Sequence, residues 1–301
     1  MSRYTKRYAL CSLILGSLFI TLPYSSYGSG IGENVNSTNS AGANRCTLVK
    51  EAPKTITIDP FTTYGICSYL KSRKGVVSAA LYDESSKELF LYNPGVLGFA
   101  ASMIKVDILA SILSSRRASG IKVTAVERGW AKSSIELSDN PATESIWEDL
   151  GYNRVMDVFN RKLGFSQSVG NPLNIWGLSL TTPSDQIKLL RHIILSSTVI
   201  DQKDQLYIQS LMEGVTPSQR FGVPNGVSRS SVVGVKNGWD RESDGKWQVN
   251  TFGYVKSSSN PYMLVIMSKG NPNESYGAST VSVVSRFIWG FESVLPTYQA
   301  L

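Results

Sequence analysis

The segment Ser102-Met103-Ile104-Lys105 places a serine three residues before a lysine, where an apolar-periodic helix is predicted to begin. Residues three apart share one helix face, so Lys105 can take the hydroxyl proton of Ser102 if burial and a second cation lower the lysine pKa. The helix N-terminus also favours a serine alkoxide. The segment therefore predicts Ser102 as a nucleophile and Lys105 as its base.

Other catalytic schemes find less support in the sequence. The single histidine, His192, lies in the apolar helical run 189–195, which favours a structural role over a Ser-His-Asp triad. No Gly-x-Ser-x-Gly motif occurs, and no cysteine and histidine cluster has metal-ligand spacing, so we expect neither a metal nor a cofactor. A second Ser-x-x-Lys segment, 68–71, has the same spacing but is not accompanied by comparable motifs.

A second motif, Ser138-Asp139-Asn140, follows the run 132–137. Ser138 can relay a proton to a leaving group, and the side chain of Asn140 can hold a substrate amide. The same residues also fit a capped turn before Pro141, so the motif alone leaves both readings open.

A third motif, Lys236-Asn237-Gly238, is predicted to close a strand. It supplies a second cation and a glycine without a side chain at a sheet edge, where a substrate backbone can lie alongside. A polar strand end is the structural alternative. The three motifs in this order, with helices between the first and the third, form a known catalytic signature.

The surrounding pattern predicts an α+β fold, with an antiparallel sheet flanked by helices and an all-helical lobe. Alternating or continuous apolar runs predict strands, and a 3.6-residue period predicts helices. The stretch of about 102–212 is predicted to be helical without a strand. We expect strands at 75–83, 88–93, 231–235, 247–256 and 262–268, and helices at 60–73 and 279–295.

The first 28 residues resemble a secretory signal, with a basic start, an apolar run and small residues before a cleavage point. A retained membrane anchor is the competing interpretation. Residues 29–45 form a Gly-, Ser- and Asn-rich linker, and 46–301 one globular domain. The formal charge of +7 falls to +4 without Arg3, Lys6 and Arg7, and the remaining basic residues are scattered, which argues against nucleic-acid binding.

Two cysteines, Cys46 and Cys67, remain after the predicted cleavage. An even number of cysteines in an exported chain predicts a disulfide, which would stabilise the fold by ~3 kcal/mol in the chain-entropy model. Two separate buried thiols are the alternative.

The three motifs resemble those of the class A β-lactamase and penicillin-binding serine hydrolase superfamily over 57–295. The resemblance implies that Ser102 is acylated and that its N–H and that of Trp239 form an oxyanion hole. It also implies that Lys236 or Arg241 meets a substrate carboxylate, with β-lactams or cell-wall peptides as substrates.

The sequence also departs from this superfamily. Asn237 stands where the superfamily usually has a Ser or Thr, and the stretch between the first two motifs is short. The segment Gly170-Asn171-Pro172-Leu173-Asn174 lacks the glutamate that serves deacylation in class A enzymes. No Asp or Glu occurs in 158–184. We therefore expect a secreted or envelope-associated hydrolase with slow deacylation. A non-catalytic cell-wall binding protein and an esterase that uses the same Ser and Lys are the alternatives.

Overall fold

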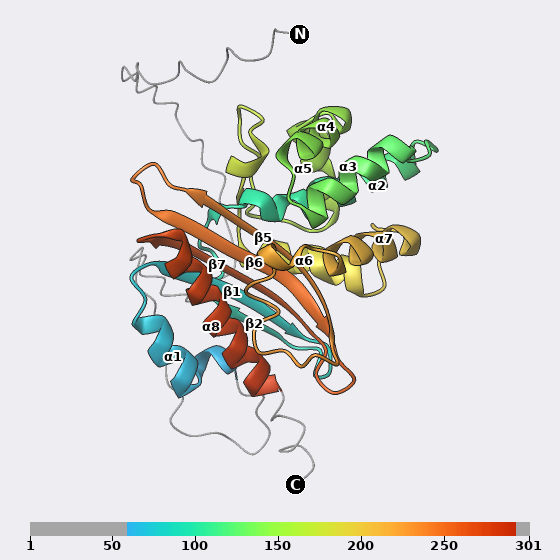
Figure 1. Cartoon of the computed structure of the whole chain (residues 1–301). Coiled ribbons are helices and arrows are strands. Elements are labelled where there is room, and N and C mark those ends of the chain that lie inside the picture. Colours follow the sequence, from blue (N-terminus) through green and yellow to red (C-terminus); the bar gives the residue numbers. More distant parts are fainter. Residues whose placement is uncertain (1–58, 293–301) are drawn as a thin grey trace, which may run out of the picture. The chain divides into compact units, whose positions relative to one another are not determined.

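A computed structural model describes residues 59–292, and its centre is a five-stranded antiparallel sheet (Figure 1). The strand order is β2-β1-β7-β6-β5, so β5 is an edge strand. A separate two-stranded sheet joins the short strands β3 and β4. The strands are β1 (Val76–Asp83), β2 (Leu89–Tyr92), β3 (Gly98–Phe99), β4 (Leu180–Thr181), β5 (Val232–Arg241), β6 (Trp247–Lys256) and β7 (Tyr262–Asn271).

Helices cover the sheet and also form a lobe beside it (Figure 1). α8 packs on β6 and β7 and also contacts α1, while α6 packs on β1 and β7 and α7 on β5. The lobe is built around α2, which contacts α3, α4, α5 and α7. The α-helices are α1 (Tyr64–Lys71), α2 (Lys105–Ala118), α3 (Ala125–Glu136), α4 (Asn140–Leu150), α5 (Asn153–Lys162), α6 (Pro183–Ile194), α7 (Gln202–Glu213) and α8 (Glu274–Glu292).

Side-chain caps set the starts of α4 and α6. Asp139 caps α4 by accepting a hydrogen bond from the Ala142 amide at 2.7 Å. Thr182 caps α6 in the same way, and Pro183 follows at the first helical position. The central residue of the second motif is therefore a helix cap that holds Ser138 and Asn140 on either side of the helix start.

The structure confirms the α+β class and corrects three predicted boundaries. The strand predicted at 231–235 continues to Arg241, so the third motif lies inside β5 and does not close it. The helical stretch contains one short strand, β4, which pairs with β3 just before the first motif. The last helix begins earlier, at Glu274. A strand pairing of two residues leaves no periodicity for a sequence pattern to detect.

Apolar side chains from both the sheet and the lobe form one hydrophobic cluster. Within 59–292, no helix is long and apolar enough to cross a membrane. The predicted signal, the linker and Cys46 lie outside the described residues. Cys67 is buried on α1, and its disulfide with Cys46 stays a prediction.

Candidate active site

The predicted nucleophile lies where two helical segments meet. Ser102 belongs to a short 3₁₀ helix, Ala101–Ile104, which runs directly into α2 at Lys105. Ala101 has a φ of +47°, a conformation that residues with a side chain seldom adopt. The strained backbone thus lies immediately before Ser102, which is only half-buried.

Lys105 is buried and its ammonium contacts the second motif directly. Nζ donates to the Ser138 carbonyl and to Asn140 Oδ1, both at 2.7 Å, and lies 3.3 Å from Ser138 Oγ. Burial lowers the pKa of Lys105 to about 7, although the nearby Asp139 carboxylate opposes the shift. Near neutral pH a large share of Lys105 is therefore an uncharged amine, which is the form that can accept a proton.

Ser138 connects the two lysines. Its hydroxyl accepts a hydrogen bond from Lys236 Nζ at 2.9 Å, opposite its contact with Lys105. Lys236 is fully buried, and burial together with the Lys105 cation lowers its pKa well below the usual range. The structure brings Lys105, Ser138 and Lys236 together as one chain of polar contacts. A hydroxyl between two amines of lowered pKa is well placed to pass a proton.

Gly238 makes room for the nucleophile segment against β5. A Cβ at this position would lie 2.7 Å from the backbone nitrogens of Ser102 and Met103 and 3.0 Å from the Ala100 carbonyl. Such contacts are too short for any side chain, so only glycine permits this approach. The close packing also brings the Ser102 backbone next to Gly238. Trp239 follows Gly238, and the N–H groups of Trp239 and Ser102 are predicted to form the oxyanion hole.

Asn237 and Trp239 point their side chains at the neighbouring segment that contains Phe221. Asn237 Nδ2 donates to the carbonyls of Gln219 and Phe221 at 2.8 and 2.9 Å. The rings of Trp239 and Phe221 lie 5.8 Å apart. Successive residues on a strand face opposite ways, so Asn237 cannot share the face of Lys236. Its amide holds the adjacent loop, which differs from the substrate contact predicted for it.

Arg241 lies at the exposed end of β5. Its Nε donates to the Gly245 carbonyl at 3.2 Å, within the hairpin turn that leads to β6. It lies five positions beyond Lys236 along the strand, which is about 17 Å. The structure does not bring Arg241 to the three connected motifs, whereas Lys236 is at their centre.

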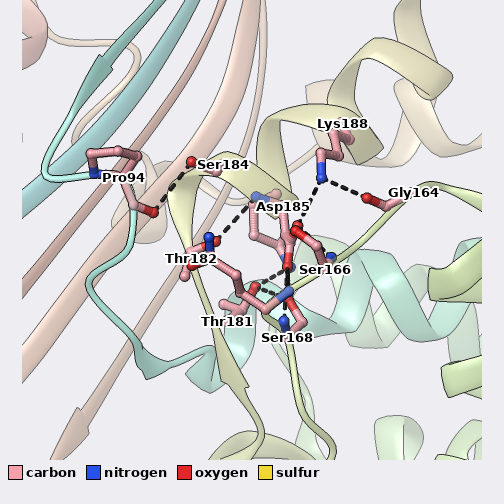
Figure 2. A network of polar contacts seen from close by, with 11 residues as sticks. Pro94, Gly164, Ser166, Ser168, Thr181, Thr182, Ser184, Asp185 and Lys188 are labelled. Atoms are coloured by element: carbon pink, nitrogen blue, oxygen red, sulfur yellow. Dashed lines mark hydrogen bonds and ion pairs between the residues drawn. The ribbon is translucent and has the colours of Figure 1, made fainter. Parts of the chain in front are cut away.

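The segment between α5 and α6, here called the 163–179 loop, is fastened at its start by Asp185. The carboxylate of Asp185 accepts hydrogen bonds from the amides of Ser166, Gln167 and Ser168 at 2.8 to 3.0 Å and from Lys188 at 3.0 Å (Figure 2). Burial would raise the pKa of Asp185, but these bonds outweigh it and lower the pKa. An ionised anchor therefore fixes the loop.

Gly170, where the resemblance leads us to expect a glutamate, lies against the side chain of Asn153. A Cβ there would come within 2.4 Å of Asn153 Oδ1, and Asn153 Nδ2 in turn donates to the Asn171 carbonyl. Further along, Trp147 Nε1 donates to the Asn174 carbonyl at 2.8 Å. This part of the loop is thus held by amide and indole groups.

Trp176 covers the ammonium of Lys105. Its ring lies 5.0 Å from Lys105 Nζ, and its Nε1 donates to Glu144 Oε2 at 3.0 Å. Glu144 lies one turn beyond Asn140 on α4 and is solvent-exposed. The indole both contacts the cation through its π face and limits the access of water to it.

Sequence reasoning missed both Trp176 and Glu144. Glu144 lies outside 158–184 and reaches the loop from α4. Its spacing of four residues from Asn140 predicts that both side chains share one face of that helix, and this was the signal in the sequence. The alternative Ser68 is exposed on α1, outside this group of contacts. Among residues 59–292, no cluster of three histidine, cysteine or carboxylate groups is arranged to hold a metal.

Comparison with solved structures supports this fold. A class A β-lactamase from Bacteroides cellulosilyticus matches with a TM-score of 0.66 and 16% identity, covering 75% of this chain and 95% of that one. PBP-A matches with a TM-score of 0.65 and 18% identity, covering 75% of this chain and 94% of that one.

A curated relative comes from Mycobacterium tuberculosis and is named "Putative lipoprotein LppW". It is 21% identical over 216 residues, which are 70% of this chain and 68% of the relative. The family model described as "Beta-lactamase enzyme family" matches residues 119–291, which is more than half of the chain. The match includes the second and third motifs and confirms the resemblance drawn from them, so the chain belongs to the β-lactamase enzyme family.

Proposed function

We propose that this protein is an envelope-located serine hydrolase that forms an acyl-enzyme on Ser102 with β-lactams or D-Ala-D-Ala-like peptides and releases the acyl group slowly. The observation that carries the proposal is the contact chain from Lys105 through Ser138 to Lys236 beside the Ser102 segment. The predicted signal supports the envelope location, as does the lipoprotein name of the mycobacterial relative.

Acylation begins with proton transfer from the Ser102 hydroxyl to uncharged Lys105, and the serine oxygen attacks the substrate carbonyl. Negative charge that develops on the carbonyl oxygen is stabilised by the Ser102 N–H, with Trp239 N–H as the predicted second donor. Ser138 then passes a proton to the leaving nitrogen, drawing on the lysines on either side of it. The amide bond breaks and an ester to Ser102 remains.

Lys236 and Asn140 are proposed to bind the substrate. Lys236 Nζ donates to Ser138 Oγ and to the Asn237 carbonyl, and in its protonated form it is proposed to meet a substrate carboxylate. Asn140 uses its Oδ1 for Lys105, so its Nδ2 can donate to a substrate carbonyl.

Hydrolysis of the ester needs a water molecule and a base. The 163–179 loop has no carboxylate, and Trp176 covers Lys105. A positioned base accelerates a step by roughly 10²- to 10⁴-fold. Its loss should raise the free-energy barrier of deacylation by about 3 to 5 kcal/mol, while the barrier of acylation is unchanged. The ester should accumulate.

A chromogenic cephalosporin, mixed in small excess over the protein in a stopped-flow instrument, tests this proposal. We expect a burst of one product per protein molecule followed by a much slower steady state. Linear turnover without a burst would show that deacylation is fast. Absence of any reaction, also with simple ester substrates, would favour the non-catalytic binding protein.

A further inference from the structure

A groove of about 250 Å³ lies along the C-terminal half of α6, beside the end of α5 and apart from the motifs. Lys188, Arg191 and His192 line it, and these positions share one helix face because they are three and four residues apart. Leu163 and Leu195 are its apolar walls. No acidic side chain lines the groove, so its polar lining is dominated by hydrogen-bond donors.

Arg191 is a cation without a carboxylate partner in the described part of the chain. Its guanidinium lies 4.6 Å from the centroid of the Tyr82 ring, and its Nε is buried without a hydrogen-bond partner. The buried Nε is shielded from solvent, so the terminal Nη groups are the guanidinium donors that remain for a ligand in the groove. The stacked ring also holds the guanidinium in one orientation.

The hydrogen bonds of Ser197 fix the tautomer of His192. Ser197 Oγ accepts from the amides of Val199 and Ile200, both at 3.0 Å, so its own proton goes to His192 Nδ1 at 2.9 Å. The neutral imidazole therefore carries its proton on Nε2. Burial and the neighbouring Arg191 cation lower the pKa of His192, which keeps this neutral tautomer. Its remaining polar atom is thus a donor.

Lys188 has one donor left after two contacts. Its ammonium donates to Asp185 and to the Gly164 carbonyl, which fixes its position beside the groove (Figure 2). The C-terminal carbonyls of α6 would repel an anion, but Gln205 Nε2 donates to those of His192 and Leu195. The negative end of the helix is therefore largely neutralised next to the groove.

We propose that this groove binds a phosphate-type oxyanion, free or as a phosphate ester, through Arg191, Lys188 and His192 Nε2. Three separate donor groups suit an anion with three oxygens better than a carboxylate with two. A small organic substituent on an ester can lie against Leu163 and Leu195. This binding is separate from the proposed acylation of Ser102, and the test keeps the two apart.

Isothermal titration of the full domain with inorganic phosphate, glycerol phosphate and acetate tests the proposal. We expect saturable binding of a phosphate and weaker binding of acetate. Tighter binding of glycerol phosphate identifies an ester as the ligand, and equal affinities identify the free ion. Arg191→Gln should weaken phosphate binding at least tenfold, and His192→Phe should weaken it several-fold because it keeps a planar ring but lacks the donor.

Arg154→Gln is the matched control, since Arg154 is exposed on α5 and does not line the groove. It should leave phosphate affinity unchanged. Equal circular dichroism spectra and equal urea unfolding midpoints in all variants verify their fold independently of any acylation. The proposal is overturned if phosphate does not saturate, if acetate binds as well, or if Arg191→Gln and His192→Phe both bind phosphate like the wild type.

Discussion

The two sides of the candidate site differ in the kind of group that each supplies. On the side of the three motifs, two buried lysines meet at Ser138, and their pKa values are lowered. On the side of the 163–179 loop, amides, an indole and glycine take the place of a charged base. In the proposed mechanism the motif side forms the ester, and the loop, which contains no Asp or Glu, lacks a carboxylate to help remove it.

The largest expected effect concerns the nucleophile. Ser102→Ala removes the attacking oxygen, so covalent labelling by a fluorescent penicillin should disappear. Ser68→Ala, at the exposed position with the same local spacing, is the control and should label at the wild-type rate. Equal loss in both variants would mean that a common effect on the fold, and not the nucleophile, governs labelling.

Lys105→Ala should slow acylation by roughly 10²- to 10⁴-fold, because a positioned base is lost. In the wild type, the uncharged amine is the active form, so the acylation rate should rise with pH through a midpoint near the Lys105 pKa of about 7. Stopped-flow labelling from about pH 5 to pH 9 measures this. Lys71→Ala on the exposed α1 segment should match the wild type. A pH-independent rate would refute the lysine base.

Trp176→Ala should move that midpoint upward by about one to two pH units. Burial shifts the pKa of Lys105 from 10.5 to about 7, which corresponds to about 5 kcal/mol. Loss of the cation–π contact with Trp176 would lower the pKa of Lys105, but this contact is worth only ~0.5–2 kcal/mol. The rise in pKa that follows from renewed hydration of the ammonium should therefore be the larger effect. Trp176→Phe retains the cover and should shift the midpoint less. A downward shift for Trp176→Ala would show that the ring mainly stabilises the charged lysine.

The smallest effect is expected at Gly170. Gly170→Ala pushes the side chain of Asn153 from its bond to Asn171, which should lower the free energy of unfolding by about 1–2 kcal/mol. Gly177→Ala in the same loop meets no atom within 4 Å and should change it by less than about 0.5 kcal/mol. Urea denaturation compares them. Equal stability of the two variants would contradict the close contact.

The same contact limits a simple repair of the loop. Introducing a carboxylate by Gly170→Glu would have to displace Asn153 first. We therefore expect little gain in turnover from this change alone.

The three motifs could be recognised from the sequence because their signals are local. Ser102 and Lys105 lie within one helical turn, and the order of the three motifs carries topological information. The structure places Lys236 against Ser138, whereas the amide of Asn237 holds the adjacent loop, and the substrate contacts proposed for both residues stay predictions. The alternation of side chains along a strand puts the two residues on opposite faces once the motif is placed inside β5.

The loop side could not be predicted in the same way. Trp176 meets Lys105 and Glu144 across 71 and 32 residues of sequence, and such contacts leave no periodic pattern. Gly170 shows only as a missing acid in the sequence, whereas its packing against Asn153 arises from the position of α5. The contacts of these residues depend on long-range packing, so they become visible only in the folded structure.

The most direct test of the central claim is a time course of intact-protein mass after mixing with benzylpenicillin. We predict that wild-type protein gains the mass of one penicillin and that this adduct persists far longer than it takes to form. Ser102→Ala should gain none. Complete hydrolysis of the penicillin with no adduct at any time would contradict slow deacylation, and a persistent adduct on Ser102→Ala would contradict the assigned nucleophile.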